Sequence, residues 1–568
     1  MLARVALSER PVGRVELSEE LFDAADDPLG AVRWCLADLR RCLDRPELFR
    51  GDPLVVPREA IWLDVWALWD GVLPVPEIGG VLLAGVEPRN CPRFDAWLIV
   101  ARGECAARGA AELRQAALRL LAAGDARAAA EPAGRAAGLD PLDEDAQELF
   151  LHVLVAAGEL STAAARLALC EATLVREGIR PSPALRAAVT LPAPLPRIGV
   201  RAGRVAAALL RAGRAALDAG SVDAGVETLR RAAEEAERSG DLELQADVLR
   251  TLGSALVHAV RGFDGEGAVV LHRAMAAARR AGLPALVGDV LRELAFVDLQ
   301  AGRHALAERA LTEAAGLAEQ AADRALSAGI LGARGMNRAD QGRHADAAGL
   351  LAASAELAGA VGSTRQAAWS HGVLGRSLLL AGRTGEARAA VERSIAACDR
   401  ERWNAFRPWP QALRAECLAG EGNIDAAQQD AEEAFALACE LGDPCWEGMA
   451  ARTLALSALR DGDTDAAQAW ILDARRRCDR VPDRYVWVSS YVGLAQLEIA
   501  ARCRPDLVGT LATRLRADAI RYDLPEFLAW ALVYQAQAGD SSGVGVARSL
   551  AWNVTNPALH DRLAAIAV

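Results

Sequence analysis

The hydrophobic positions of residues 29 to 43, LGAVRWCLADLRRCL, follow the period of an α-helix. Successive apolar residues are separated by four, three and four positions, which places them on one helical face. They are Val32, Leu36, Leu39 and Leu43. The side chains left to point elsewhere are Arg33, Trp34, Ala37, Arg40 and Arg41. The pattern predicts an amphipathic helix with a core-facing side and an arginine-bearing side.

Glycine recurs every 40 residues in the second half of the chain. The five regular positions are Gly302, Gly342, Gly382, Gly422 and Gly462, and the alanines five residues later are Ala307, Ala347, Ala387, Ala427 and Ala467. Midway lie Gly282, Gly362, Gly442 and Pro482, and the series continues approximately at Gly220, Gly262 and Gly539. Glycine closes a helix in the left-handed conformation, and alanine near the bend lets two helices approach closely. The pattern resembles tetratricopeptide-like repeats and predicts a stacked α-solenoid.

A shorter repeat precedes this array. Gly124 and Gly158 are 34 residues apart, and an alanine follows each by five residues, at Ala129 and Ala163. Three prolines in TLPAPLPRIG predict a stiff linker between the two arrays. The sequence therefore divides into residues 1–70, helical repeats at 71–189, a linker at 190–199 and a solenoid at 200–568. The predicted fold class is mostly α.

Composition excludes several kinds of chemistry. The 568 residues are 52% hydrophobic and 25% charged, which is typical of a soluble, well-packed protein. Lysine is absent from the sequence, so a Walker A loop and Schiff-base chemistry are both excluded. The formal net charge is −12, so any contact with DNA must be local.

The cysteines and histidines give no metal or catalytic pattern. Eleven scattered cysteines without a CxxC pair indicate reduced thiols, and HExxH is absent. His304 and His344 follow turn glycines and are interpreted as helix-start residues. GDSSG (539–543) fits GxSxG, but a helical segment precedes it where a nucleophile elbow needs a strand. We expect no enzyme activity, no metal and no cofactor. The N-terminus lacks a cleavable apolar segment and no run could span a membrane, so we expect a cytoplasmic protein.

The first 69 residues differ from the repeats. The segments LVV and AIWLDV flank the charged sequence VPRE, which predicts a small β-hairpin after the arginine-bearing helix. The order of helix, short helix, arginine-bearing helix and hairpin is typical of the later part of a winged helix.

Four ordered segments carry a family resemblance. They are PRFDAWL (92–98), LLAAGDARAA (120–129), GLDPLDEDAQELFLHVLVAAGELSTAAAR (138–166) and REGIRPSPALRA (176–187). They resemble the bacterial transcriptional activator domain, which follows an OmpR-like winged helix in the Streptomyces antibiotic regulatory protein (SARP) family of activators. The resemblance covers roughly residues 1 to 189, and members commonly carry C-terminal tetratricopeptide arrays. Larger members insert a nucleotide-binding ATPase module before the repeats, and this chain is too short there to contain one.

The resemblance implies a role for the N-terminal residues. The helix at 29–43 would be the recognition helix, with Arg33, Trp34, Ala37, Arg40 and Arg41 facing DNA, and Arg50 and Arg58 would lie on the wing. The family binds promoter DNA, often as a dimer, and helps to recruit RNA polymerase.

Two features depart from the family pattern. Met1 already stands inside the first helix, so the winged helix is expected to be truncated, or the start codon to be assigned too far downstream. Residues 1–69 contain nine arginines and thirteen acidic residues, and Asp38 lies within the proposed recognition helix.

Aromatic residues gather late in the solenoid. Residues 400–552 hold seven of the thirteen tryptophans and all four tyrosines. The candidate groove residues for a protein or small-molecule effector are Trp403, Arg407, Trp409, Trp446, Arg484, Tyr485 and Trp487. The alternative is that the tryptophans fill the core of the last repeats and that Pro408 and Pro410 start a helix.

The sequence thus supports a non-enzymatic transcriptional regulator that binds promoter DNA. The alternative is a tetratricopeptide scaffold, adaptor or ligand-sensing protein that does not bind DNA.

Overall fold

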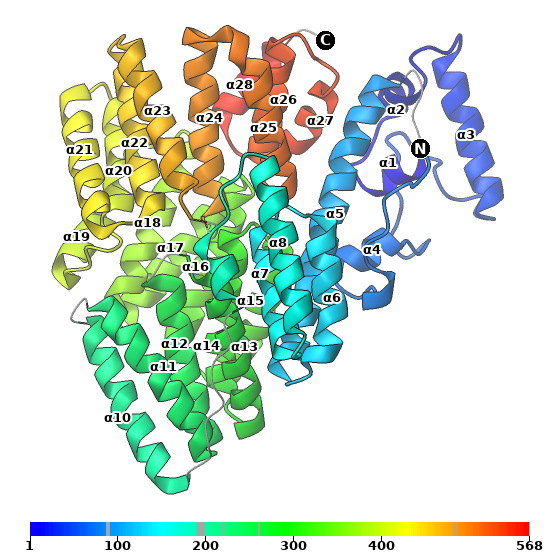
Figure 1. Cartoon of the computed structure of the whole chain (residues 1–568). Helices are drawn as coiled ribbons and strands as arrows, with labels where there is room; N and C mark the ends of the chain where they lie inside the picture. The colour runs from blue at the N-terminus through cyan, green and yellow to red at the C-terminus, as the bar shows by residue number, and fades with distance from the viewer. Residues whose placement is uncertain are drawn as a thin grey trace.

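The N-terminal third of the chain is built from short helices and one long helix. The computed structural model describes residues 1–8, 10–86, 91–189, 199–218, 221–259, 262–481 and 484–566. The first elements are α1 (Leu2–Ala6), α2 (Arg14–Leu21), α3 (Pro28–Cys42), α4 (Asp64–Trp69), a 3₁₀ helix (Val75–Glu77), α5 (Pro92–Ala122), α6 (Ala126–Leu139), α7 (Glu144–Ala156), α8 (Leu160–Arg176) and α9 (Pro183–Ala187). Figure 1 shows α1 to α4 at one edge of the molecule, joined to the rest by α5.

The remaining helices stack as antiparallel pairs into a solenoid (Figure 1). They are α10 (Gly199–Asp218), α11 (Val222–Ser239), α12 (Leu242–His258), α13 (Asp264–Ala281), α14 (Pro284–Gln300), α15 (His304–Gln320), α16 (Arg324–Asp340), α17 (His344–Ala360), α18 (Thr364–Leu380), α19 (Thr384–Glu401), α20 (Pro408–Gly420), α21 (Ile424–Leu441), α22 (Pro444–Arg460), α23 (Thr464–Cys478), α24 (Val486–Cys503), a 3₁₀ helix (Pro505–Leu507), α25 (Val508–Arg521), α26 (Pro525–Gln537), α27 (Val544–Ala551) and α28 (Pro557–Ala564). The fold is mostly α with a tetratricopeptide-like solenoid, as predicted.

The repeat pattern marks the bends of this solenoid. All five glycines at the 40-residue positions have φ between 75° and 85°, and each lies in the turn between the two helices of a unit. The five alanines that follow them are fully buried. Gly282, Gly362 and Gly442 also have positive φ, and His304 and His344 begin α15 and α17 as predicted. Pro482, Gly220 and linker residues 190–198 lie outside the described residues, and Gly199 begins α10.

One substitution tests why alanine recurs. Ala467 on α23 is fully buried, whereas Ala469 on the same helix is exposed. We expect Ala467→Leu to lower the free energy of unfolding by about 1–3 kcal/mol, because the added atoms push the paired helices apart. Ala469→Leu is the matched control and should leave stability almost unchanged. Chemical denaturation measures both, and equal effects would contradict the close-approach explanation.

The predicted β-hairpin at residues 54–65 is wrong. The structure has one isolated antiparallel bridge there, between Val12 and Leu54, and Asp64 begins helix α4. Helix α4 buries Trp66 and Leu68, and the indole Nε1 of Trp66 donates to the carbonyl oxygen of Ala6 at 3.1 Å. The residues of the predicted hairpin therefore form an irregular segment followed by the first turn of a helix.

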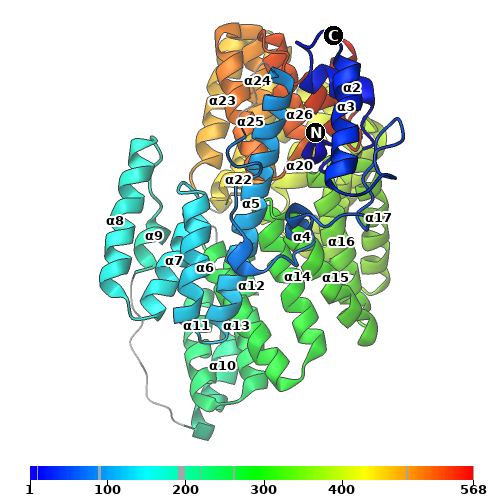
Figure 2. The ribbon, with the colours of Figure 1, turned by 90° about the vertical axis from the view of Figure 1, so that its right-hand side faces the viewer.

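The solenoid closes on itself through its C-terminal helices. His344 at the start of α17 lies 2.9 Å from the carboxylate of Glu526 on α26, and both side chains are buried. The backbone N–H of Thr555 donates to the carbonyl oxygen of Gly342 at 2.9 Å. Helix α5 lies against α25, and Figure 2 shows it beside the C-terminal helices. The C-terminal helices therefore contact both α5 and the middle of the solenoid.

Candidate functional site

Helix α3 is held by the core of a small N-terminal helical unit. Val32 is fully buried and Leu36 almost so, and Leu39 and Leu43 pack against the same cluster. The predicted core face of this helix is therefore correct. The side chain of Asp27 accepts a hydrogen bond from the backbone N–H of Gly30 at 2.8 Å, and Pro28 occupies the first turn, which explains where the helix begins.

The opposite face of α3 is open. Figure 1 shows α3 at the outer edge of the molecule, and its main packing partner is α2. Arg33, Trp34, Ala37 and Arg41 are exposed, and the indole of Trp34 is 68% exposed. Arg41 pairs with Asp38, and Arg33 lies 3.5 Å from Asp27. Exposed ion pairs of this kind are weak, so both guanidinium groups can exchange these partners for a phosphate.

The other three candidate arginines are engaged within the protein. Arg40 donates to the carbonyl oxygens of Leu48 and Phe49, each at 2.8 Å. Its contacts tie the end of α3 to the loop that follows. Arg50 donates to the carbonyl oxygen of Pro46 at 2.8 Å.

Arg58 also contacts its own unit. It pairs with Asp70 at 2.8 Å, and its guanidinium carbon lies 5.6 Å from the ring centroid of Trp66. Because the predicted hairpin does not form, neither Arg50 nor Arg58 lies on a wing strand.

The aromatic residues of the predicted groove form one contiguous cluster, but most of it is core. Trp409 is 2% exposed, Tyr485 is 6% exposed and Trp487 is fully buried. Trp409 contacts Trp446, with ring centroids 5.1 Å apart, and Trp487 at 6.2 Å. The three buried rings cannot line an open groove in this conformation, and the core interpretation accounts for them. Pro408 begins α20, as the alternative interpretation expects.

The remaining groove candidates lie at the border of this cluster. Trp403, Arg407, Trp446 and Arg484 are partly exposed. Arg407 pairs with Asp399 at 2.8 Å, and Trp446 donates from Nε1 to the carbonyl oxygen of Ala405 at 3.1 Å.

A buried polar network lies beneath the aromatic rings. Arg376 donates to Asp340 and to the phenol oxygen of Tyr485, both at 2.6 Å, and the Tyr485 hydroxyl donates to Asp340 at 2.7 Å. The guanidinium carbon of Arg376 also lies 4.1 Å from the Trp487 ring centroid. Burial raises the pKa of Tyr485 well above its usual value, so the phenol stays protonated and donates. No spacing along the chain indicates that Asp340 and Arg376 meet Tyr485.

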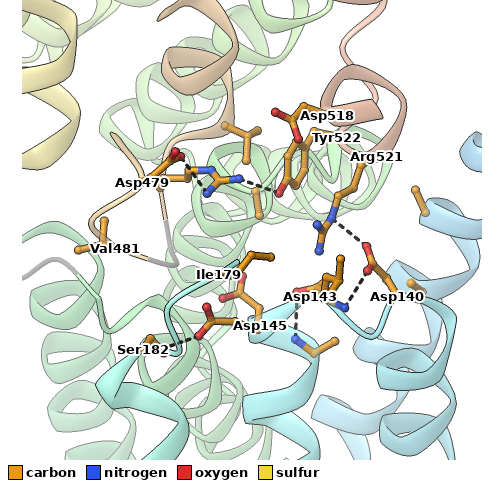
Figure 3. A pocket seen from close by; sticks show the side chains of 18 of the residues that line it. Asp140, Asp143, Asp145, Ile179, Ser182, Asp479, Val481, Asp518, Arg521 and Tyr522 are labelled. Carbon is orange, nitrogen blue, oxygen red and sulfur yellow. Dashed lines mark hydrogen bonds and ion pairs between the residues drawn. The ribbon is translucent and has the colours of Figure 1, made fainter. Parts of the chain in front are cut away.

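A cavity of 1690 Å³ lies where three parts of the chain meet (Figure 3). One wall comes from α5, the α6–α7 loop and the segment after α8. A second comes from the α14–α15 turn, and the third from the end of α23, the residues before α24, and α25. Arg521 pairs with Asp140 at 2.8 Å and joins the first and third walls. We call it the junction cavity.

Asp145 in the junction cavity provides a pH test. Burial, followed by the nearby Asp143, raises the pKa of the Asp145 carboxyl to about 7 from 3.8. The folded state therefore binds this proton more tightly than the unfolded state, and its stabilising effect is lost as pH rises from 3.8 to about 7. We expect Asp145→Asn to remove this loss and to be more stable than the parent protein above that range. Thermal unfolding across the range measures the difference, and parallel pH curves would contradict the prediction.

Other chemistries find no support in the described part of the chain. No group of three or more His, Cys, Asp or Glu side chains there could hold a metal ion. Residues 539–543 follow the helix α26. A nucleophile elbow follows a strand, so this described segment does not have that arrangement. None of the helices described has the length and apolar character needed to cross a membrane.

The later part of the N-terminal third matches a known protein family. Residues 79–190 match the bacterial transcriptional activator domain. The matched segment comprises α5 to α9, the helices between α1–α4 and the solenoid. No curated protein matches the sequence.

Several solved structures align with this chain at low sequence identity. A Rap protein complexed with competence and sporulation factor aligns with 61% of this chain and 99% of its own, at 12% identity and a TM-score of 0.44. The Rap conjugation gene regulator of plasmid pLS20, in complex with the Phr* peptide, aligns with 65% of this chain and 97% of its own, at 11% identity and a TM-score of 0.38. Yeast Tom70 aligns with 75% of this chain and 95% of its own, at 13% identity and a TM-score of 0.33.

Proposed function

We propose that the protein is a transcriptional activator that binds promoter DNA through α3 and receives a signal through its solenoid. The match of residues 79–190 to the bacterial transcriptional activator domain carries this proposal. The exposed arginines of α3 are suited to phosphates and guanine edges. RNA polymerase is the proposed target of activation, and a homodimer on repeated half-sites is the proposed binding form. The protein is proposed to be cytoplasmic and to have no enzyme activity.

Contacts through the activator domain would couple the N-terminal unit that carries α3 to the solenoid. Arg93 on α5 pairs with Glu19 on α2 at 3.0 Å, and Arg4 on α1 lies over the ring of Trp97, with its guanidinium carbon 5.8 Å from the centroid. On the solenoid side, Arg309 on α15 pairs with Glu112 on the same α5 helix. Helix α5 therefore contacts the repeats and also α2, which is the main packing partner of α3.

DNA binding tests the proposal. We expect the purified protein to bind its own upstream intergenic DNA more tightly than a scrambled duplex in fluorescence anisotropy, and to weaken as salt rises. Arg33→Ala/Arg41→Ala should weaken binding and reduce the slope of log affinity against log salt by about 2, because each lost phosphate contact contributes about 0.9.

The controls separate binding from folding. Arg383→Ala removes an exposed arginine of the solenoid and should leave DNA binding unchanged. Arg40→Ala removes the two carbonyl contacts of α3 and should lower thermal stability. Binding to the intergenic duplex no tighter than to the scrambled one at low salt would contradict the proposal.

The second candidate is a scaffold or ligand-sensing protein without DNA binding. The acidic balance of residues 1–69 and the position of Asp38 beside Arg41 favour it, because carboxylates repel phosphates. Failure of the DNA-binding test with a correctly folded protein would support this function.

A further inference from the structure

The junction cavity has an arginine-rich wall with too few carboxylates. Asp479 is shared by Arg475 at 3.0 Å, Arg484 at 3.4 Å and Arg514 at 3.5 Å. Asp518 adds one further carboxylate, 3.5 Å from Arg475. Three guanidinium groups thus converge on two carboxylates, which leaves a net positive charge at this wall.

The electrostatics of Arg514 agree with this excess. Burial, followed by the guanidinium of Arg475, lowers the pKa of Arg514 below its usual value. Burial also lowers the pKa of Arg484, but Tyr522 and the shared carboxylate of Asp479 outweigh it and raise that pKa above its usual value, so the repulsion is felt at Arg514. An added anion at this wall would therefore relieve repulsion between the arginines.

Two buried donors of the cavity also lack acceptors. The Nε of Arg484 is buried without a hydrogen-bond partner, and so is the Nε of Arg114, whose side chain is 7% exposed and lines the cavity from α5. Among the residues described, no carboxylate lies within ion-pair distance of Arg114. Leaving a buried guanidinium unpaired is costly, and an anionic ligand group would remove that cost.

The size and lining of the cavity indicate more than a single small ion. Its volume of 1690 Å³ exceeds what one phosphate needs, and Ile179, Val481 and Tyr522 add apolar surface (Figure 3). The Tyr522 hydroxyl lies 3.4 Å from Arg484. A ligand with an anionic group against the arginines could therefore place an organic body on these side chains.

We propose that the junction cavity binds a small polyanion, a phosphorylated or polycarboxylate metabolite, whose charged group is held by Arg475, Arg484 and Arg514. Guanidinium groups recognise both phosphate and carboxylate through paired, charge-assisted hydrogen bonds. The activator domain supplies one wall and two separated parts of the solenoid supply the others, so a bound ligand would fasten them together. The role of this ligand as an effector rests on the proposed function, whereas the binding of the ligand to the cavity is independent of that function.

Isothermal titration calorimetry with the full chain tests the site, using pyrophosphate and citrate as probes at matched ionic strength. We expect one polyanion to bind per chain and to raise the thermal unfolding midpoint. Arg484→Gln and, separately, Arg514→Gln should weaken binding about tenfold or more, because each removes a charged hydrogen-bond donor. Stronger binding of pyrophosphate would identify a phosphorylated ligand, and stronger binding of citrate a polycarboxylate.

The control variant is Arg502→Gln. Arg502 lies on α24, its side chain is 60% exposed, and it does not line the cavity. This change should leave probe binding unchanged. The proposal is overturned if neither probe binds at millimolar concentration, or if binding survives both Arg484→Gln and Arg514→Gln in variants that unfold at the parent temperature. Neither readout involves DNA, so failure here is distinct from failure of the proposed function.

Discussion

Arg376→Met is expected to lower the free energy of unfolding by about 3–5 kcal/mol, because it leaves a buried carboxylate without its cation. Arg376 and Asp340 are each 1% exposed and 2.6 Å apart, so water cannot replace the lost partner. Methionine keeps most of the side-chain volume, which separates loss of charge from loss of packing. Urea unfolding followed by tryptophan fluorescence measures the change, and two of the thirteen tryptophans, Trp409 and Trp487, flank the guanidinium.

A surface arginine provides the control. Arg343 pairs with Asp346 at 2.5 Å, but their side chains are 43% and 52% exposed. Arg343→Met should change stability by about 0–1 kcal/mol. Similar effects of the two substitutions would show that burial of the Arg376 network contributes nothing beyond an ordinary ion pair.

Gly302→Ala is expected to be the second most damaging change, because it combines backbone strain with a clash. Gly302 has φ 75°, a conformation that costs an alanine about 1–2 kcal/mol. A Cβ at this position would also clash with the backbone oxygen of Tyr522 at the end of α25. Separating these two segments should cost about 1–3 kcal/mol more.

The repeat itself supplies the matched variant. Gly462 occupies the same position in its unit and has φ 83°, but a Cβ there would meet nothing within 4 Å. Gly462→Ala therefore carries the backbone strain alone. Thermal and urea unfolding of both variants isolate the contact between the α14–α15 turn and the end of α25, and equal losses would mean that this contact adds no stability.

Local spacing predicted the helices well because each signal acts within one hairpin. Gly342 and Ala347 mark a bend and a close approach only five residues apart, and both roles appear in the structure. The prediction for AIWLDV was wrong because a short apolar run fits either a strand or a buried part of a helix. The contact of Trp66 with Ala6 on α1 stabilises the helical conformation. This contact joins residues 60 positions apart, so the local sequence does not indicate it.

The candidate sites were harder to predict because their residues also meet through contacts between distant parts of the chain. Exposure of Arg33 and Arg41 follows from the period of α3, whereas the capture of Arg40 by Leu48 and Phe49 depends on the loop after the helix. Asp340 and Tyr485 are 145 residues apart, and no spacing rule connects them. The junction cavity draws its walls from three such distant parts, so only the folded chain reveals it.

Docking of α5 on the last helices has a consequence for synthesis of the protein. Phe94, Trp97 and Leu98 belong to the same core as Phe527 and Leu528. At about 5–20 residues per second, a ribosome needs on the order of a minute to make the chain between them. The part of α5 that packs on the last helices lacks these partners during that interval, so this part of the nascent chain must be protected from aggregation until the final repeats emerge.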